Sequence, residues 1–350
     1  MAKNKYPCAL LINDIHVSKD NIPEFHKNWD EALKIATELD ISDIIIGGDL
    51  WQSRSGQTLD VLLAVRSAIK KAQQADIFLT IAEGNHDLVD QESLLGYSHI
   101  FDGYEKVNVV SDYDVIGFAG DVDLYVMSYF PENGSFSRRL NELINQHNIK
   151  DSDFTNILYV HQGIRGGLGK PTDDELPTSI FQDFDAVLVG HYHDRRAIPR
   201  TNIQYIGASR QHNFGEDEEK GYTILFSDGS TQFIKNESNI RYRVIEIDYN
   251  NVDSEFMNEI SRLAEDPRYK LKVKVLCKNN ETSSIDKAKM LEAGAAKVEI
   301  VKDSITVMET QSLSIEQKFD KAGIKKEYES FCADKAINSE MGIKYLDKIN

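Results

Sequence analysis

Five short apolar runs in the first 200 residues are each followed, within a few positions, by a polar motif that contains Asp, Asn or His. Such runs are too short for buried helices and are typical of strands covered on both faces of a sheet. They are Ala9–Ile12, Ile44–Ile46, Ile77–Ile81, Ile157–Val160 and Ala186–Val189. Between the first three runs, apolar residues recur at helical spacing, behind Pro23 and again behind the N-cap candidate Thr58. This alternation predicts a layered α/β domain.

Composition narrows the class of protein further. The chain has 350 residues, of which 41% are hydrophobic and only 7 are proline, which excludes a disordered or fibrous chain. At about 150 residues per domain, the length favours two domains. The three cysteines, Cys8, Cys277 and Cys332, are far apart and indicate neither a disulfide framework nor a Cys-x-x-Cys metal site. No apolar stretch approaches the ~20 residues that cross a bilayer, so we expect a cytoplasmic protein without a membrane segment.

The net charge of −17 is unevenly distributed. Residues 241–350 hold 19 basic and 20 acidic side chains, so residues 1–240 carry −16 of the total. An acidic body repels nucleic acid at long range. Any phosphate-bearing substrate must therefore be held by metal ions or by local basic residues.

The pattern of predicted strands and helices changes after about residue 201 and again after residue 240. From about residue 201, short strands alternate with turn residues, and we expect an antiparallel edge or a second sheet of a first domain that covers residues 1–240. Residues 241–310 then predict a small β-α-β-α-β domain. Over residues 311–350, apolar side chains at roughly helical spacing predict a helical C-terminal segment. That segment is either a lid over its own domain or a docking region for a partner.

The polar motifs contain nearly all the functional information. They are Asp14-Ile15-His16, Gly48-Asp49, Gly84-Asn85-His86-Asp87, His161-Gln162-Gly163 and Gly190-His191-Tyr192-His193. Because ligands of open α/β sheets bind at the carboxyl ends of the strands, we expect these side chains to converge. Carboxylate, amide and imidazole groups without thiolates suit Mn²⁺, Fe²⁺ or Zn²⁺.

The spacing within the motifs favours two ions. Residues i and i+2 of an extended segment point the same way, so Asp14 and His16 can bind one ion together, as can His191 and His193. The two oxygens of Asp49 can bridge two ions, and two ions about 3.5–4 Å apart can polarise a phosphate for in-line attack. Each motif alone is more often a turn or a solvated loop. Five of them at strand ends predict a dinuclear metal centre.

The series D-x-H, G-D, G-N-H-D, H and G-H-x-H resembles the calcineurin-like metallophosphoesterases over about residues 8–240. The resemblance implies a four-layer α/β/β/α sandwich with two divalent metal ions, of which Mn²⁺ is the family expectation and Fe²⁺ or Zn²⁺ the alternatives. It implies that one ion is bound by Asp14, His16, Asp49 and His193, and the other by Asp49, Asn85, His161 and His191. His86 matches the family's histidine that assists the transition state or protonates the leaving oxygen. We expect Asp87 to orient His86 by a hydrogen bond.

Further features resemble the SbcD-type DNA exonuclease subunits of double-strand-break repair complexes, and in layout the phage-encoded recombination nucleases. Gly47–Trp51 and His161-Gln162-Gly163 are similar to their motifs, as is the segment from Tyr205 to Tyr222. The small α/β unit resembles their capping domain, which contacts DNA. Gln52 departs from the pattern, because some of these nucleases have a histidine there that assists exonuclease action.

Basic residues cluster near the motifs. Arg165, Arg195, Arg196 and Arg210 are candidates for contacts with DNA phosphates, and Lys170 lies beside them. The alternative is that they pair with nearby acidic residues on a solvated surface. His212 is the one further histidine near the motifs, and it lacks ligand spacing.

These features lead to the hypothesis of a metal-dependent DNA exonuclease or endonuclease subunit of an SbcC/SbcD-like repair or recombination complex. The resemblance implies three partners, namely DNA, a second copy of the chain and an SbcC-like coiled-coil ATPase. It implies dimer contacts through Thr58–Ala75 and the segment after Asp87. One alternative is a stand-alone phosphoesterase that acts on a small nucleotide or a phosphoprotein. Another is a non-catalytic scaffold that binds DNA ends, against which the complete ligand set argues.

Overall fold

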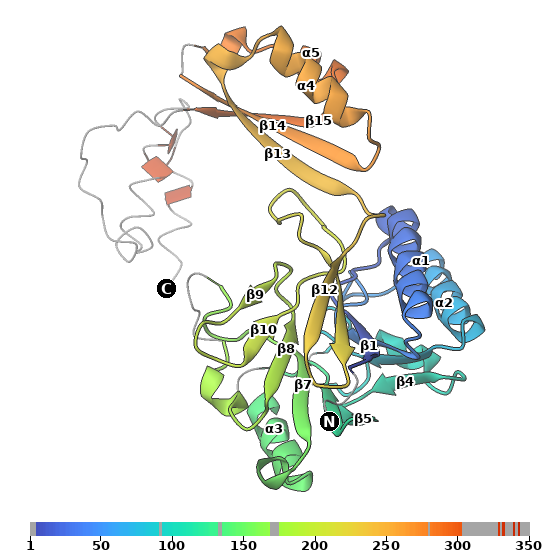
Figure 1. Ribbon diagram of the computed structural model, residues 1–350. Helices are drawn as coiled ribbons and strands as arrows, with labels where there is room; N and C mark the ends of the chain where they lie inside the picture. The colour runs from blue at the N-terminus through green and yellow to red at the C-terminus, as the bar shows by residue number, and fades with distance from the viewer. Residues whose placement is uncertain are drawn as a thin grey trace. The chain divides into compact units, whose positions relative to one another are not determined.

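The computed structural model describes residues 5–90, 93–131, 135–168, 175–278 and 281–302, together with a few residues beyond 327. Within this part of the chain, the strands form two six-stranded sheets and one three-stranded sheet (Figure 1). The chain divides into two compact units, residues 1–275 with 284–300 and residues 276–283 with 301–350.

The first sheet has the strand order β12-β11-β1-β2-β3-β4. Its strands are β1 (Pro7–Ile12), β2 (Asp43–Gly47), β3 (Phe78–Ala82), β4 (Val107–Val110), β11 (Gly221–Phe226) and β12 (Thr231–Lys235). The strands β1 to β4 are parallel, and β11 and β12 add an antiparallel edge. The predicted strands at β1, β2 and β3 and the predicted antiparallel edge after residue 201 are therefore confirmed.

The second sheet has the order β5-β6-β7-β8-β10-β9. Its strands are β5 (Tyr113–Phe118), β6 (Val122–Met127), β7 (Thr155–His161), β8 (Ala186–Gly190), β9 (Arg196–Ala197) and β10 (Ile203–Tyr205). The strands β6, β7, β8 and β10 are parallel neighbours. Because Ile203 and Tyr205 are buried apolar residues, β10 continues the core of this sheet instead of joining the antiparallel edge.

Helices cover the outer faces of both sheets. The helices α1 (Ile22–Glu38) and α2 (Leu59–Gln74) lie side by side against the first sheet, and α3 (Ser135–Gln146) packs on the second (Figure 1). Residues of β1 alternate between two cores, because Leu10 faces α1 and α2 whereas Leu11 faces the second sheet. The four-layer α/β/β/α sandwich is confirmed.

Short 3₁₀ turns connect several of these elements. They span Lys19–Asn21, Tyr97–Phe101, Ile149–Asp151, Thr178–Phe181, Tyr249–Asn251 and Thr282–Ser284.

The third sheet, β13-β14-β15, belongs to the predicted small domain. Its elements are β13 (Arg241–Asp248), α4 (Ser254–Ala264), β14 (Tyr269–Cys277), α5 (Lys287–Glu292) and β15 (Ala295–Lys302). Asp253 and Asp286 cap the two helices, each accepting a hydrogen bond from a backbone N–H of the first turn. The β-α-β-α-β order is confirmed. The boundaries at residues 240 and 310 stay predictions, and nearly all of the predicted segment 311–350 lies outside the described residues.

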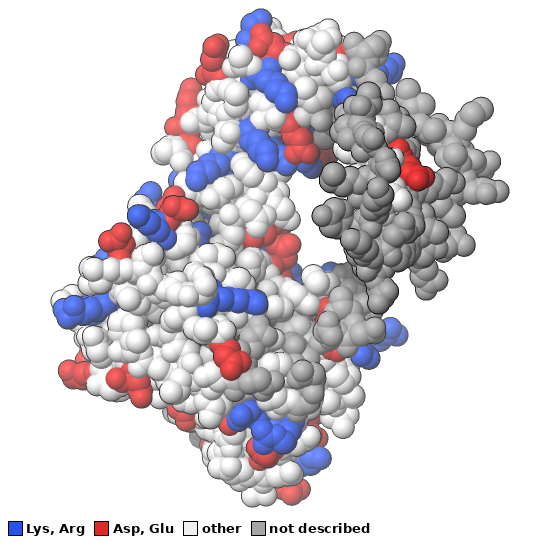
Figure 2. All heavy atoms as spheres, turned by 180° about the vertical axis from the view of Figure 1, so that it is seen from behind, with Lys and Arg blue, Asp and Glu red and all other residues white. Residues whose placement is uncertain are grey.

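No helix in the described ranges is long and apolar enough to cross a membrane. On the face of the molecule in Figure 2, basic and acidic side chains are interspersed and do not gather by sign.

Tyr159 on β7 joins the two large sheets where the polar motifs begin. The side chain is fully buried, and its hydroxyl lies 3.0 Å from the carbonyl oxygen of Ile12 and 2.8 Å from Oδ1 of Asn13. A Cβ atom at Gly47 would lie 2.1 Å from Cζ of Tyr159, so only glycine lets β2 approach this ring. This contact sets the spacing between the two sheets.

We expect Tyr159→Phe to lower the free energy of unfolding by about 1–3 kcal/mol, because two buried oxygen atoms lose the one hydroxyl proton that they share. Urea unfolding measures the change. The matched control is Tyr113→Phe, whose exposed hydroxyl bonds to Gln146, and this change should cost less than about 0.5 kcal/mol. Equal losses in the two variants would contradict the role assigned to Tyr159.

Candidate metal centre

The five polar motifs meet at the carboxyl ends of parallel strands from both large sheets. Asp14 and His16 follow β1, Asp49 follows β2, and Asn85 follows β3. His161 ends β7, and His191 and His193 follow β8. The convergence of all seven predicted ligands therefore needs the sandwich, because neither sheet carries the whole set.

Two buried carboxylates lie at the centre of the cluster. Oδ2 of Asp49 is 3.5 Å from Nε2 of His16 and 3.3 Å from Nε2 of His161. Oδ1 of Asp14 is 3.9 Å from Nε2 of His161 and 3.8 Å from Nε2 of His193. Asp49 thus lies between histidines of the two predicted ion sites, as a bridging ligand requires.

His191 and Asn85 complete the cluster. Nδ1 of His191 lies 3.1 Å from Oδ1 of Asn85, and the backbone N–H of His191 lies 3.2 Å from each carboxylate oxygen of Asp14. Residues that follow β1, β3 and β8 are therefore in direct contact.

Four of the predicted ligands have a left-handed backbone, which is unusual for residues other than glycine. The φ angles are 51° at Asp14, 50° at His16, 53° at Asp49 and 88° at His191. Such conformations cost about 1–3 kcal/mol each and are typical of functional sites. Backbone hydrogen bonds hold the strained loops together, from the Asp14 N–H to Gly48 O and from the His16 N–H to Asp49 O.

Hydrogen bonds on the far side of the imidazole rings select a ligand tautomer. Nδ1 of His161 donates to the carbonyl of Gly47 at 3.1 Å, and Nδ1 of His193 bonds to Oε1 of Glu216 at 2.9 Å. When such a ring is neutral, its lone pair is on Nε2, toward the carboxylates. Nε2 of His161 is buried without a hydrogen-bond partner, 3.3 Å from Oδ2 of Asp49. An orphaned imidazole nitrogen beside a buried carboxylate fits a divalent cation, and the ring-orienting bonds are those expected of metal-bound histidines.

The electrostatics also favour a cation here. Burial lowers the pKa of His16 and of His191 to about 3, so both rings are neutral at pH 7 and able to bind a metal. Burial also opposes a proton on His161, but the carboxylate of Asp49 outweighs it and raises the pKa to about 9. Burial alone would raise the pKa of Asp49, yet His161 and His16 hold it below its ordinary value. A proton on His161 is thus the counter-charge that a metal ion would displace.

The expectation that Asp87 orients His86 by a hydrogen bond is wrong. The carboxylate of Asp87 accepts hydrogen bonds from the backbone N–H groups of Trp51 and Gly84, at 2.8 and 2.6 Å. Nδ1 of His86 donates instead to the carbonyl oxygen of Gln52, at 2.9 Å. The carboxylate of Asp87 thus bonds to backbone N–H groups. The hydrogen bond to His86 that was predicted for Asp87 is made by the backbone carbonyl of Gln52.

The four candidate arginines differ in their surroundings. Arg210 is buried and donates to the carbonyls of Ile15 and His16. Arg195 donates to the carbonyl of Ile206 and to Thr223 Oγ1, and it stacks on the ring of Phe233. Both guanidinium groups are therefore committed to the protein.

Arg165 and Arg196, by contrast, are exposed. The guanidinium of Arg196 makes a long hydrogen bond of 3.4 Å to the carbonyl of Gly167, which holds it only weakly. Lys170 lies outside the described residues.

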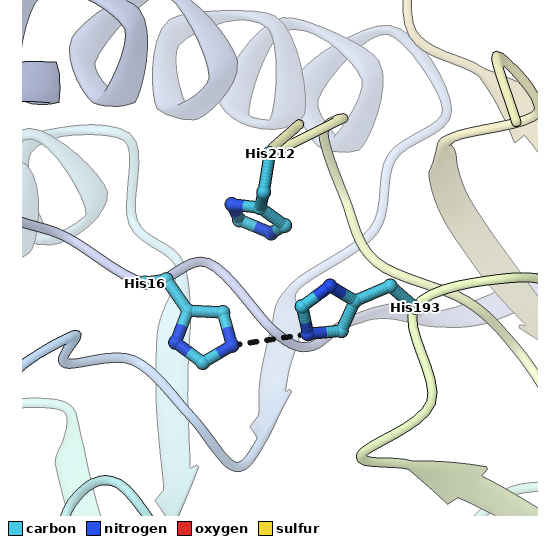
Figure 3. Close-up of side chains that lie close together, drawn as sticks. All are labelled: His16, His193 and His212. Atoms are coloured by element: carbon cyan, nitrogen blue, oxygen red, sulfur yellow. Dashed lines mark hydrogen bonds between the residues drawn. The ribbon is translucent and has the colours of Figure 1, made fainter. Parts of the chain in front are cut away.

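His212 and Glu216 are site residues that the sequence reasoning missed. The ring of His212 packs against those of His16 and His193, with centroids 5.0 and 4.7 Å away (Figure 3). Glu216 accepts the hydrogen bond from His193. No regular spacing marks either residue. The likeness of Phe214-Gly215-Glu216 to a nuclease segment is the one signal in the sequence.

Comparison with known proteins gives a consistent result. The sequence model of the calcineurin-like phosphoesterase family matches residues 9–195. "Putative phosphoesterase 244L" of Invertebrate iridescent virus 6 is 24% identical over 280 residues, which cover 78% of this chain and 94% of that protein. The SbcD component of the nuclease SbcCD of Staphylococcus saprophyticus is 25% identical over 209 residues, which cover 52% of this chain and 54% of that protein.

Among solved structures, the protein TT1561 of Thermus thermophilus aligns with a TM-score of 0.42 at 10% identity, covering 65% of this chain and 99% of that chain. A score this low supports no conclusion about function.

We expect the wild-type protein to bind two Mn²⁺ ions per chain in isothermal titration calorimetry. Asp49→Asn should weaken binding by at least about 100-fold, because it changes the one carboxylate shared by both ligand groups. The matched control is Asp43→Asn at the opposite end of the same strand, which should bind Mn²⁺ like the wild type. Unchanged binding in Asp49→Asn would contradict the assignment of Asp49.

Proposed function

The chain belongs to the calcineurin-like phosphoesterase family, and from this premise we propose that it is a metal-dependent DNA nuclease, the catalytic subunit of an SbcC/SbcD-like repair or recombination complex. The observation that supports the hydrolase most strongly is the convergence of the seven proposed ligands, of which two are buried carboxylates and five are imidazole or amide side chains around them. The similarity to a nuclease component across half of the chain favours DNA as the substrate.

The proposed centre holds two divalent ions. Asp14, His16, Asp49 and His193 would bind one ion, and Asp49, Asn85, His161 and His191 would bind the other. When bound, the ions polarise the phosphate and lower the pKa of water. We propose Mn²⁺ from the family resemblance, with Fe²⁺ or Zn²⁺ as alternatives, because oxygen and imidazole donors accept all three.

His86 is the proposed proton donor. Its ring is half-buried and meets the ring of His16 edge-on, with the centroids 4.9 Å apart. The bond from Nδ1 to the Gln52 carbonyl fixes the ring and leaves Nε2 for the substrate. The oxygen of water forms the new bond to phosphorus and its proton passes to solvent, while the ester bond breaks with its electron pair on the leaving oxygen, which takes a proton from Nε2 of His86. At position 52 the backbone carbonyl, and not the side chain, holds His86.

A hollow of about 400 Å³ beside His191 and His193 is the proposed entry for a DNA strand. Its wall includes Arg196, Tyr192 and Asn213. Arg196 and the exposed Arg165 are the proposed phosphate contacts, since Arg195 and Arg210 are engaged elsewhere. Local cations of this kind are needed because residues 1–240 are strongly acidic.

We expect the protein to shorten end-labelled linear DNA, duplex or single-stranded, in the presence of Mn²⁺. EDTA and His86→Ala should each abolish the reaction, the first by removing the ions and the second by removing the proton donor. A parallel reaction with a generic aryl phosphodiester distinguishes general phosphodiesterase activity from cleavage of DNA. Cleavage of the aryl diester alone would favour a stand-alone phosphoesterase, and DNA binding without any cleavage would favour a scaffold.

A homodimer is part of the proposal. Leu59 and Leu63 on α2 and Leu95 and Ile100 in the segment after Asp87 are exposed large apolar residues. The hydroxyl of Tyr97 donates to the carbonyl of Arg54, which lies in the loop before α2. Exposed apolar side chains in both segments are candidates for an interface, and we assign this interface to a second copy of the chain.

We expect Leu59→Glu combined with Leu63→Glu to convert a dimer into a monomer in sedimentation velocity, because charges would enter an apolar contact. Phe154→Glu, which changes an apolar residue elsewhere that is about as exposed as Leu63, should leave the dimer intact. A wild-type protein that sediments as a monomer would remove this part of the proposal.

The SbcC-like coiled-coil ATPase remains a proposed partner by family resemblance alone. The segment 311–350 that would dock it lies almost wholly outside the described residues.

A further inference from the structure

The loop that carries Asp14 and His16 is held by a segment almost 200 residues away. We call this segment, Ser209–Glu216, the strap. Four consecutive carbonyl groups of the loop each accept a hydrogen bond from it. The pairs are Asn13 O with Ser209 N at 3.1 Å, Asp14 O with His212 Nε2 at 2.8 Å, Ile15 O with Arg210 Nε at 3.0 Å, and His16 O with Arg210 Nη2 at 3.1 Å.

These bonds matter because the loop is strained and buried. Asp14 and His16 both have left-handed φ angles, and both side chains are almost fully enclosed. Carbonyls in such a place need donors from the protein, and fixed donors on four successive carbonyls leave the loop a single conformation.

The strap also holds the histidine from the second sheet. Oε1 of Glu216 accepts from Nδ1 of His193, and Oε2 of the same carboxylate accepts from the backbone N–H of His212 at 3.1 Å. One strap thus orients Asp14, His16 and His193, which are three of the four proposed ligands of one ion.

The strap itself is anchored on its other side. Ser209 exchanges hydrogen bonds with Asn28 on α1, where its Oγ donates at 2.9 Å and its carbonyl accepts at 3.3 Å. Gln211 exchanges hydrogen bonds with the backbone of Tyr242 on β13, at 2.8 and 2.9 Å. Arg210 and His212 therefore bond to the ligand loop while Gln211, between them, bonds away from it.

We propose that Arg210 and His212 are positioning residues of the metal centre, which hold the backbone of Asp14 and His16 so that one ion is bound tightly. His212 lies close enough to be mistaken for a ligand (Figure 3). A carbonyl oxygen only accepts, so Nε2 of His212 is a donor to Asp14 and is not free for a metal. The inference rests on the proposed metal-dependent function but does not require DNA as the substrate.

The test compares Mn²⁺ binding by calorimetry with thermal unfolding in EDTA. His212→Leu, which removes the donor, should bind Mn²⁺ about tenfold or more weakly, in the range typical of lost supporting groups. His212→Gln keeps an N–H donor of similar reach and should restore the affinity. Asn202→Leu is the matched control, because Asn202 donates to the carbonyls of Phe181 and Phe184 at the opposite end of the strands. It should lower the melting temperature and leave Mn²⁺ affinity unchanged.

Equal Mn²⁺ affinity in His212→Leu and the wild type would overturn the proposal, as would an equal loss of affinity in Asn202→Leu. If His212→Leu is unfolded in EDTA, the Arg210→Lys variant tests the proposal instead. Lysine keeps the positive charge but cannot bond to the carbonyls of both Ile15 and His16 as Nε and Nη2 of Arg210 do. Weaker Mn²⁺ binding in that folded variant supports the proposal, and unchanged binding overturns it. A protein that degrades no DNA but shows these affinity differences would lose only the DNA assignment.

Discussion

The burial of two carboxylates, Asp14 and Asp49, is the constraint on which the rest of the centre depends. An ionised carboxylate away from water is costly unless charge and hydrogen bonds compensate it. Here the compensation comes from imidazoles of both sheets, which lie within 4 Å of the carboxylate oxygens. Burial keeps His16 neutral at pH 7, whereas the carboxylates outweigh burial and raise the pKa of His161 and of His193. Protons on these two rings are one source of positive charge beside the carboxylates, and bound divalent cations would be another.

The close approach of the two sheets depends on glycines as much as on residues with large side chains. A Cβ at Gly48 would lie 2.5 Å from Nδ1 of His161, and one at Gly84 would lie 2.3 Å from the backbone N of Asp49. The glycines of the polar motifs therefore serve the close approach of neighbouring strand ends. Tyr159, between the sheets, fills the space directly behind the ligands. The distance between the sheets and the geometry of the centre are thus set by the same contacts.

The convergence of the proposed ligands could be predicted from the sequence because each follows an apolar run that is itself recognisable. Regions without such runs were missed. The strand β5 is only half-buried along its length, and β6 includes a polar Asp123 and Tyr125, so neither has the uniform apolar pattern of β1 or β8. Contacts across long separations were missed for a different reason. The bonds from Arg210 and His212 join residues almost 200 positions apart, and no local pattern specifies them.

Asp87 shows how the hydrogen bonds of a predicted site residue can differ from those that its place in the sequence suggests. Its two oxygens hold the backbone N–H groups of Gly84 and Trp51, at the two ends of the loops that carry Asn85 and Asp49. Burial and the neighbouring Glu83 raise the pKa of Asp87, so the carboxylate is placed there at an electrostatic cost. The strap holds the loop of Asp14 and His16 in a similar way. Its side chains donate hydrogen bonds to backbone carbonyls of that loop, whereas Asp87 accepts hydrogen bonds from backbone N–H groups. Both loops are therefore held through their backbones, and the hydrogen bonds of Asp87 connect the loop that carries Asn85 and His86 to the loop that carries Asp49.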